Sequence, residues 1–303
     1  MSTGDDDARS VLLVTHPSRE QAADSARSIA TALLDAGIEV RVPEAEEASL
    51  GVGGVVPVAA VQGAAKGCEL VVVVGGDGTI LRGAELARGT GAALLGINLG
   101  HFGFLAEAEP EDLSSVVERL VARDYVVEER LTLDVVVLRD GGEHLRTWAV
   151  NEASIEKRSR ERLIELVIEV DGRPLSRWGC DGVVCATPTG STAYAFSAGG
   201  PVVWPEVQAM LLVPLSAHAL FARPLVAAPT SVLAVELAPG TSPGVLWCDG
   251  RRTSELEPGD RIESRRSPEP LRLARIHHKP FTDRLVRKFD LPVTGWRGRS
   301  GRA

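Results

Sequence analysis

Buried-strand patterns alternate with helical patterns over the first part of the chain. Apolar runs at residues 10–15, 38–42, 70–74 and 92–98 predict strands, and helical spacing predicts helices over 19–34, after residue 78 and over 110–121. Runs such as LVVVV suit parallel strands buried on both faces. Residues 10–127 are therefore predicted to form a doubly wound α/β domain, in which ligands bind at the carboxyl ends of the strands. Residues 43–67 show no firm period, so we expect a loop or a poorly ordered insert there.

The pattern changes near Glu128. Strand-like segments follow at residues 131–138, 145–150, 163–170, 183–187, 231–237, 245–248, 261–263 and 271–276. Glycine turns such as Asp140-Gly141-Gly142 and Asp171-Gly172 separate several of them, which is typical of hairpins. We predict a second, mainly β domain over residues 128–280, with residues 281–296 returning to the first domain.

Composition narrows the functional classes. The chain has 303 residues, 44% of them hydrophobic and 24% charged, and a formal net charge of −8. This balance argues against broad nucleic-acid binding, which leaves a basic footprint, and no apolar run approaches the roughly 18 residues of a membrane span. The first nine residues are polar and acidic, so we expect no signal peptide. The four cysteines (Cys68, Cys180, Cys185 and Cys248) lack metal-binding spacing, which predicts reduced thiols and a cytoplasmic protein.

A glycine-rich turn after the strand at 70–74 is the strongest site signal. It reads Gly75-Gly76-Asp77-Gly78-Thr79 and leads into a helix, which is a typical phosphate-binding arrangement. Asp77 is anomalous, because a carboxylate repels phosphate unless a metal ion or a reacting hydroxyl lies between them. Phosphoryl transfer needs such a group to orient the attacking oxygen. The alternative is that Asp77 only caps the helix.

Three further stretches place polar groups beside predicted strands. Asn151-Glu152 ends an apolar run, and neighbouring side chains reach one ligand only at a strand end or a bulge. Asp181-Gly182 precedes an apolar strand. The loop over residues 185–201 contains glycine and many hydroxyls but no lysine, and its polar and flexible members include Thr187, Thr189, Gly190, Ser191, Thr192 and Ser197. Each stretch, taken alone, also fits an ordinary turn.

Taken in order, these motifs resemble those of the NAD kinases. The set is Gly75-Gly76-Asp77-Gly78-Thr79, Asn98-Leu99-Gly100 with Gly103-Phe104-Leu105, Asn151-Glu152, Asp181-Gly182 and Thr187-Pro188-Thr189-Gly190-Ser191-Thr192-Ala193-Tyr194. The resemblance runs over about residues 10 to 297, and the ending FTDRLVRKFDLPVTGWRG is similar to the actinobacterial branch. It implies a two-domain fold and phosphorylation of the 2′-hydroxyl of the adenosine ribose of NAD, giving NADP. The implied donor is ATP or polyphosphate, used with Mg²⁺.

The resemblance also implies roles for individual residues. Asp77 matches the family's proton acceptor, and Gly75, Gly76 and Thr79 match its phosphate-donor loop. The implied contacts to NAD are Asp77, Gly78, Arg82, Asn151, Glu152, Arg162, Asp181, Thr192, Ala193, Tyr194, Ala195, Phe196 and Ser197.

Some implications concern assembly and departures from the family pattern. Asp181 matches a contact made across a subunit interface, so a homodimer or homotetramer is implied. Arg251 occupies a position where some members have glutamine. Gly179 occupies a position where some members have arginine. The metal ligands are unknown from the sequence.

Two other function classes remain open at this point. A lipid kinase could use the same Gly-Gly-Asp-Gly-Thr loop, but the charge of −8 and the lack of an amphipathic anchor argue against a membrane surface. A non-catalytic NADP(H) sensor fits the binding motifs and leaves Asp77 without a task.

Overall fold

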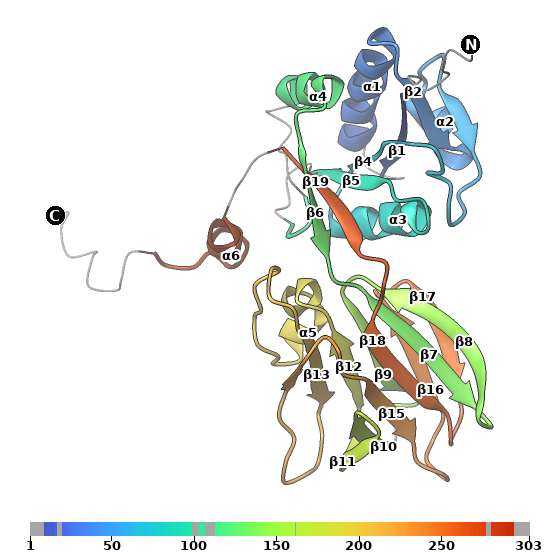
Figure 1. The fold of residues 1–303 in the computed structure, drawn as a ribbon, viewed down its shortest axis with the longest axis vertical. Helices are drawn as coiled ribbons and strands as arrows, with labels where there is room; N and C mark the ends of the chain where they lie inside the picture. Colours follow the sequence, from blue (N-terminus) through green and yellow to red (C-terminus); the bar gives the residue numbers. More distant parts are fainter. Residues whose placement is uncertain are drawn as a thin grey trace, which may run out of the picture. The chain divides into compact units, whose positions relative to one another are not determined.

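The computed structural model describes residues 9–16, 20–98, 103–106, 113–160, 162–276 and 280–293. The chain divides into two compact units, one formed by residues 1–129 and 272–303 and the other by residues 130–271. Each unit has its own hydrophobic core and its own sheets (Figure 1).

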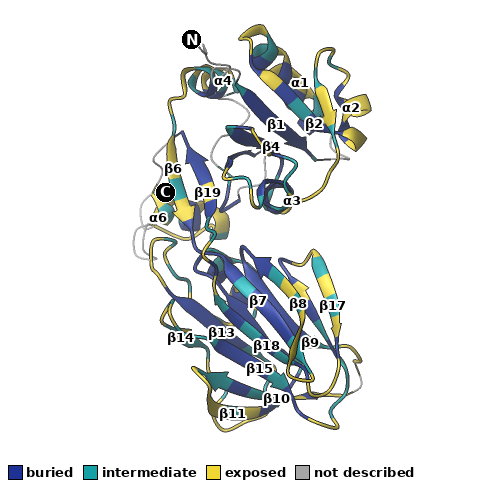
Figure 2. Cartoon of the chain, turned by 45° about the vertical axis from the view of Figure 1, so that its right-hand side comes forward, coloured by how far each residue is buried: buried dark blue, intermediate teal, exposed yellow. Residues whose placement is uncertain are grey.

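The first unit is built on a seven-stranded sheet with the order β3-β2-β1-β4-β5-β19-β6. The strands are β1 (Ser10–Thr15), β2 (Glu39–Pro43), β3 (Val56–Val58), β4 (Leu70–Val74), β5 (Ala93–Ile97), β6 (Val126–Arg130) and β19 (Leu271–Arg275). Strands β1 and β4 are buried along their whole length, as Figure 2 shows in dark blue. The strand order reverses between β1 and β4, and such a reversal is where doubly wound sheets bind ligands.

The described part of this unit also contains helices. They are α1 (Glu20–Asp35), α2 (Glu44–Leu50), α3 (Asp77–Ala87), α4 (Leu113–Ala122) and α6 (Phe281–Phe289). Helix α1 buries one face against the sheet, and the buried residues are Ala22, Ala26, Ile29, Ala30 and Leu33. These are the positions that the helical spacing predicted. Residue 19 and residues 110–112 of the predicted helices lie outside the described residues.

Two predictions for this unit are wrong. Residues 43–67 are not an irregular insert, because they contain α2 and β3. The short helix α2 was not predicted because its first turn is acidic, with Glu44, Glu46 and Glu47, and shows no apolar face. Glu46 is nevertheless buried. The strand predicted at 271–276 does not belong to the β domain, because β19 pairs in parallel with β5 of the first sheet. An isolated strand pattern carries no information about which sheet completes its hydrogen bonds.

The second unit consists of two six-stranded sheets. One has the order β11-β10-β15-β18-β7-β8 and the other β14-β13-β12-β9-β16-β17, and all pairings given for them are antiparallel. Their strands are β7 (Leu133–Arg139), β8 (Gly142–Ala149), β9 (Glu152–Lys157), β10 (Ile164–Val170), β11 (Arg173–Cys180), β12 (Gly182–Ala186), β13 (Met210–Leu215), β14 (Leu225–Ala227), β15 (Leu233–Leu237), β16 (Gly244–Cys248), β17 (Arg252–Leu256) and β18 (Arg261–Arg266).

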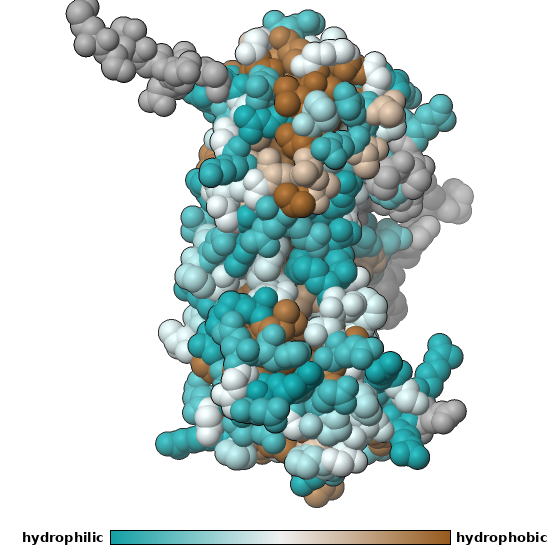
Figure 3. All heavy atoms as spheres, turned by 90° about the vertical axis from the view of Figure 1, so that its right-hand side faces the viewer, coloured by the Kyte–Doolittle hydropathy of each residue, from teal (hydrophilic) through white to brown (hydrophobic). Residues whose placement is uncertain are grey.

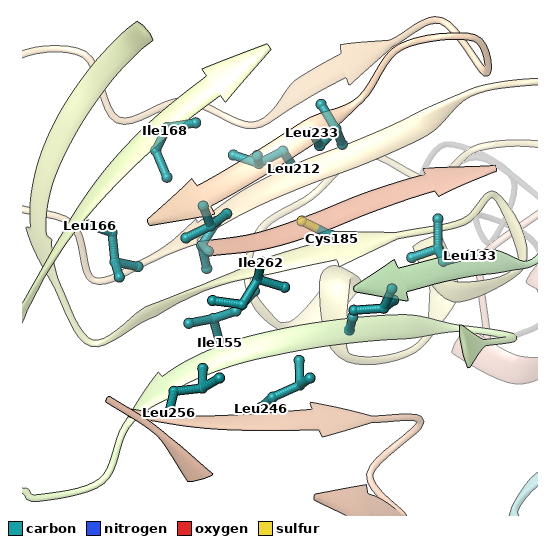
Figure 4. Close-up of a cluster of buried hydrophobic side chains, with 14 of the residues drawn as sticks. Leu133, Ile155, Leu166, Ile168, Cys185, Leu212, Leu233, Leu246, Leu256 and Ile262 are labelled. Carbon is teal, nitrogen blue, oxygen red and sulfur yellow. The ribbon is translucent and has the colours of Figure 1, made fainter. Parts of the chain in front are cut away.

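Apolar side chains from both sheets form one core in this unit. Figure 4 shows part of it, including Leu133 and Ile262 from one sheet and Ile155 and Leu212 from the other. The predicted hairpin turns are present. Asp140 and Gly141 have φ of 53° and 77°, and two successive residues with positive φ are what a tight hairpin requires.

Three features of the described residues can be compared with the expectations from the composition. All four cysteines are free thiols, as predicted, and all four are buried. No helix in the described part of the chain is long and apolar enough to span a membrane. On the face drawn in Figure 3, hydrophobic residues occur as patches between many polar ones.

Candidate functional site

The glycine-rich loop lies at the carboxyl end of β4, beside the reversal in strand order. Gly75 is buried, and a Cβ there would lie 2.5 Å from Oγ1 of Thr79, so the turn needs glycine at this point. Gly76 precedes the first residue of α3, and Gly78 is exposed. The first turn of α3 therefore presents N–H groups that phosphate oxygens can reach.

Asp77 is the first residue of α3, and a second loop holds its carboxylate. The N–H of Phe104 donates to Oδ2 (3.1 Å) and the N–H of Leu105 donates to Oδ1 (3.2 Å). A Cβ on Gly103 would lie 2.2 Å from Oδ1 of Asp77, so only glycine allows this approach. The structure thus brings together two predicted motifs, although Leu99 and Gly100 lie outside the described residues. The carboxylate accepts hydrogen bonds from this second loop, and Gly76, not Asp77, is at the N-cap of α3.

Arg82 forms a buried ion pair that the sequence did not predict. Its Nη1 lies 2.5 Å from Oε1 of Glu46, whose side chain is only 4% exposed. The other oxygen of Glu46 accepts the N–H of Thr15 at the end of β1 (2.6 Å). Arg82 is therefore held beside the carboxyl end of β1. Glu46 was missed because it lies in the segment that lacked a clear period.

In the second unit, Asn151 and Glu152 lie where the chain crosses from one sheet to the other. Strand β8 ends at Ala149 and β9 begins at Glu152, and the two strands belong to different sheets. This break is the strand end that the sequence required for both side chains to face one ligand. Both residues are buried, with 9% and 7% of their surface exposed.

The hydroxyl-rich loop over residues 185–201 packs against the backbone of Asn151. Its elements are a short 3₁₀ helix (Thr189–Thr192) and α5 (Tyr194–Ser197). The N–H of Thr187 donates to the carbonyl of Asn151 (2.9 Å), and Oγ1 of Thr187 donates to the carbonyl of Val150 (2.6 Å). A Cβ on Gly190 would lie 1.9 Å from the carbonyl oxygen of Asn151. Two separate predicted motifs are therefore in direct contact.

A cavity of 470 Å³ gathers three predicted residues, Asp181, Tyr194 and Ser197. The remaining lining residues are Glu156, Lys157, Ala198, Pro214, Leu215 and Ser216. The ammonium group of Lys157 pairs with the Asp181 carboxylate and holds the pKa of that carboxyl below its usual value. Burial, and after it the neighbouring Glu156, raises the pKa of Tyr194. Sequence reasoning missed Lys157 and Glu156, since the β9–β12 pairing brings them here.

The other predicted residues differ in their surroundings. Phe196 is 41% exposed, whereas the methyl group of Ala195 is fully buried in a small core cluster with Leu211 and Val213. Thr192 and Ala193 are half-buried. Three positions lie on other parts of the second unit: Arg162 is exposed before β10, Gly179 lies in β11, and Arg251 is in the turn between β16 and β17.

Glu152 has a strongly perturbed acidity. Burial, and after it the negative charge of Asp249, raises the pKa of Glu152 to about 8. Its Oε2 atom is buried and has no hydrogen-bond partner. At neutral pH the side chain is therefore a neutral acid that can donate one hydrogen bond.

This acidity predicts a pH dependence of stability. The folded state holds the Glu152 proton above the usual glutamate pKa of about 4.3, so stability falls as pH rises from there to about 8. We expect the Tm of the second unit to fall between about pH 5 and pH 8 and then to level off, with a smaller fall in Glu152→Gln. Calorimetry over this range measures both slopes. Glu165→Gln, at an exposed ion pair with Arg177, is the control and keeps the wild-type slope. Equal slopes for Glu152→Gln and wild type would contradict the assignment.

Comparisons with known proteins agree with these motifs. Residues 11–125 match the ATP-NAD kinase N-terminal domain, and residues 150–276 match the ATP-NAD kinase C-terminal domain. NAD kinase 2 of Streptomyces avermitilis is 60% identical over 293 residues, covering 96% of this chain and 97% of that protein. The NAD kinase of Thermobifida fusca is 58% identical over 306 residues, covering 98% of this chain and 94% of that protein. These relatives are actinobacterial, as the chain's ending indicated.

Solved structures show the same fold. Yeast NADH kinase complexed with NADH has a TM-score of 0.87 at 23% identity, over 96% of this chain and 89% of that chain. An NAD kinase from Archaeoglobus fulgidus in complex with ATP has a TM-score of 0.65 at 27% identity, over 87% of this chain and 92% of that chain. The two matched domains and the full-length relatives together show that this chain belongs to the NAD kinase family.

Proposed function

We propose that Asp77 accepts the proton of the 2′-hydroxyl of the adenosine ribose of NAD while that oxygen attacks the terminal phosphorus of ATP. The single observation that carries this proposal is the carboxylate of Asp77, oriented by two backbone N–H groups at the start of a phosphate-binding helix. Each oxygen of the carboxylate keeps a further lone pair for an incoming hydroxyl. Because aspartate is a weak base, orientation of the attacking oxygen contributes as much as proton removal.

The first unit supplies the groups that suit the phosphoryl donor. The N–H groups from Gly76 to Gly78 and the helix N-terminus stabilise negative charge on the transferring group. The complex of the Archaeoglobus fulgidus enzyme with ATP supports ATP as the donor, with polyphosphate as the alternative. No group of three or more acidic, histidine or cysteine side chains among the described residues could hold a metal ion. Mg²⁺ needs no such group, because one or two carboxylates together with the donor phosphates usually hold it, and Asp77 is the carboxylate that could assist here.

The second unit supplies the groups that suit the dinucleotide. Asp181, Tyr194 and Ser197 line the 470 Å³ cavity, and Glu152 offers a buried donor. We further propose a cytoplasmic homodimer or homotetramer, in which Asp181 contacts NAD bound to a neighbouring subunit. Asp181 is 37% exposed and therefore accessible for such a contact.

The decisive experiment is a donor and acceptor panel on the purified chain. With Mg²⁺ and ATP, NAD is expected to yield NADP, detected by an NADP-specific dehydrogenase, and EDTA is expected to abolish the product. Polyphosphate and NADH serve as the alternative donor and acceptor. A lipid kinase would instead label diacylglycerol with radioactive phosphate, and a sensor would bind the dinucleotide without making product. Absence of NADP under every condition would overturn the proposal.

A further inference from the structure

We propose that Asp249 is a positioning residue for the dinucleotide site. Its buried carboxylate holds the sheet crossing at residues 150–152 in the one conformation that turns Asn151 and Glu152 toward a common ligand. The inference rests on the proposed dinucleotide recognition by these two residues and assigns a role to a side chain outside that set.

The backbone N–H groups of the crossing depend on Asp249 for their hydrogen bonds. Between the end of β8 at Ala149 and the start of β9 at Glu152, the chain leaves one sheet before it joins the other. The N–H groups in this gap have no partner in a sheet ladder, and buried N–H groups must find one elsewhere. Asp249 supplies it: its carboxylate accepts the N–H of Val150 (3.0 Å) and of Asn151 (2.7 Å). In return, the N–H of Asp249 donates to the carbonyl of Glu152 (2.9 Å).

A tight turn places the carboxylate of Asp249 in the interior of the second unit. Asp249 and Gly250 have φ of 56° and 63°, the conformation of a tight hairpin between β16 and β17. The carboxylate is only 1% exposed, and the guanidinium of Arg252 neutralises it at 2.9 Å. Arg252 also donates to the carbonyl of Trp148 (2.7 Å) and lies 4.4 Å from the centre of its ring. A buried charge with this compensation is tolerated, whereas loss of one partner is costly.

A carboxylate at this place does more than accept hydrogen bonds. Four titratable groups interact electrostatically with the Glu152 carboxyl, so that the pKa of one partner is shifted. They are Asp249, Cys248, Glu156 and Tyr194. Burial is the main cause of the raised pKa of Glu152, and among these groups the Asp249 charge raises it most. Asp249 therefore holds the backbone on both sides of Asn151 and favours the protonated form of the Glu152 side chain.

The test compares Asp249→Asn with a matched control in the same unit. Asp260 is also buried, accepts a backbone N–H (from Glu257, 2.8 Å) and pairs with an arginine (Arg139, 2.7 Å), but it holds a different turn. We expect Asp249→Asn to raise the Kd and KM for NAD by about tenfold or more, with the KM for ATP changed by less than about twofold. Asp260→Asn is expected to leave both constants unchanged, even if its Tm falls.

A pH profile separates positioning from a general loss of structure. In wild type, kcat/KM for NAD is expected to fall as Glu152 loses its proton near pH 8, and in Asp249→Asn this fall is expected at a lower pH. If Asp249→Asn does not fold, hydrogen exchange of the Val150 and Asn151 amides in the wild-type chain without NAD replaces it, and slow exchange is expected. Wild-type NAD constants and an unshifted profile in the variant, or rapid exchange of these amides, would overturn the inference. Failure of the wild-type chain to bind NAD or make NADP would instead overturn the proposed function.

Discussion

Asp77→Asn is expected to lower kcat for NADP formation by about 10²- to 10⁴-fold, which is the usual contribution of a positioned general base. The substitution keeps the shape of the side chain and removes its ability to take a proton. The Kd for NAD is expected to stay within about threefold of wild type, because the other groups proposed to bind the dinucleotide are unchanged. Coupled-assay kinetics measure kcat, and calorimetric titration measures the Kd.

The fold is expected to survive this change. Asparagine retains one carbonyl oxygen, which can accept from the N–H of Phe104 or of Leu105 but not from both in the present geometry, so the stability loss is about 1–2 kcal/mol. Asp24→Asn, on the exposed face of α1, is the control and keeps wild-type kcat. An unchanged kcat in Asp77→Asn would exclude Asp77 as the proton acceptor. A large loss of NAD affinity with little further change in kcat would make it a binding residue instead.

Gly190→Ala is expected to have the second large effect, on the dinucleotide half of the site. The added Cβ would lie 1.9 Å from the carbonyl oxygen and 2.4 Å from the carbonyl carbon of Asn151. Both are backbone atoms, so no flexible side chain can move aside. The loop must shift, and it then loses the bonds from Thr187 to Asn151 and from Gly190 to Thr187. We expect a loss of about 2–4 kcal/mol in the free energy of unfolding and at least tenfold weaker NAD binding, roughly 1.4 kcal/mol.

Denaturant unfolding and calorimetric titration check this expectation. Gly142→Ala is the matched control, because Gly142 lies in a hairpin of the same unit, with ordinary backbone and only a 3.8 Å contact. It is expected to keep wild-type NAD affinity. Wild-type stability and NAD affinity in Gly190→Ala would show that the hydroxyl-rich loop does not depend on its contact with Asn151.

Local patterns in the sequence were sufficient for the elements that carry the phosphate-binding loop. Strands β1, β4 and β5 are apolar on both faces and need no distant partner to be recognised. The glycine turn with Asp77 was predictable because its backbone requirements act over a few residues. The hairpins at Asp140-Gly141 and Asp171-Gly172 were predictable for the same reason, since both residues of each turn need positive φ.

Only the tertiary structure decided which side chains support these motifs. Asp249 lies 98 positions from Asn151, Glu46 lies 31 positions from Thr15, and Phe104 lies 27 positions from Asp77. The distance between two residues along the sequence does not predict such contacts, because sheet pairing and loop packing determine them. The same holds for β19, whose alternating pattern fits either unit until its hydrogen bonds with β5 are formed. The sequence by itself therefore determined the chemistry of the motifs and the class of the fold, whereas long-range packing determined the partners that orient them.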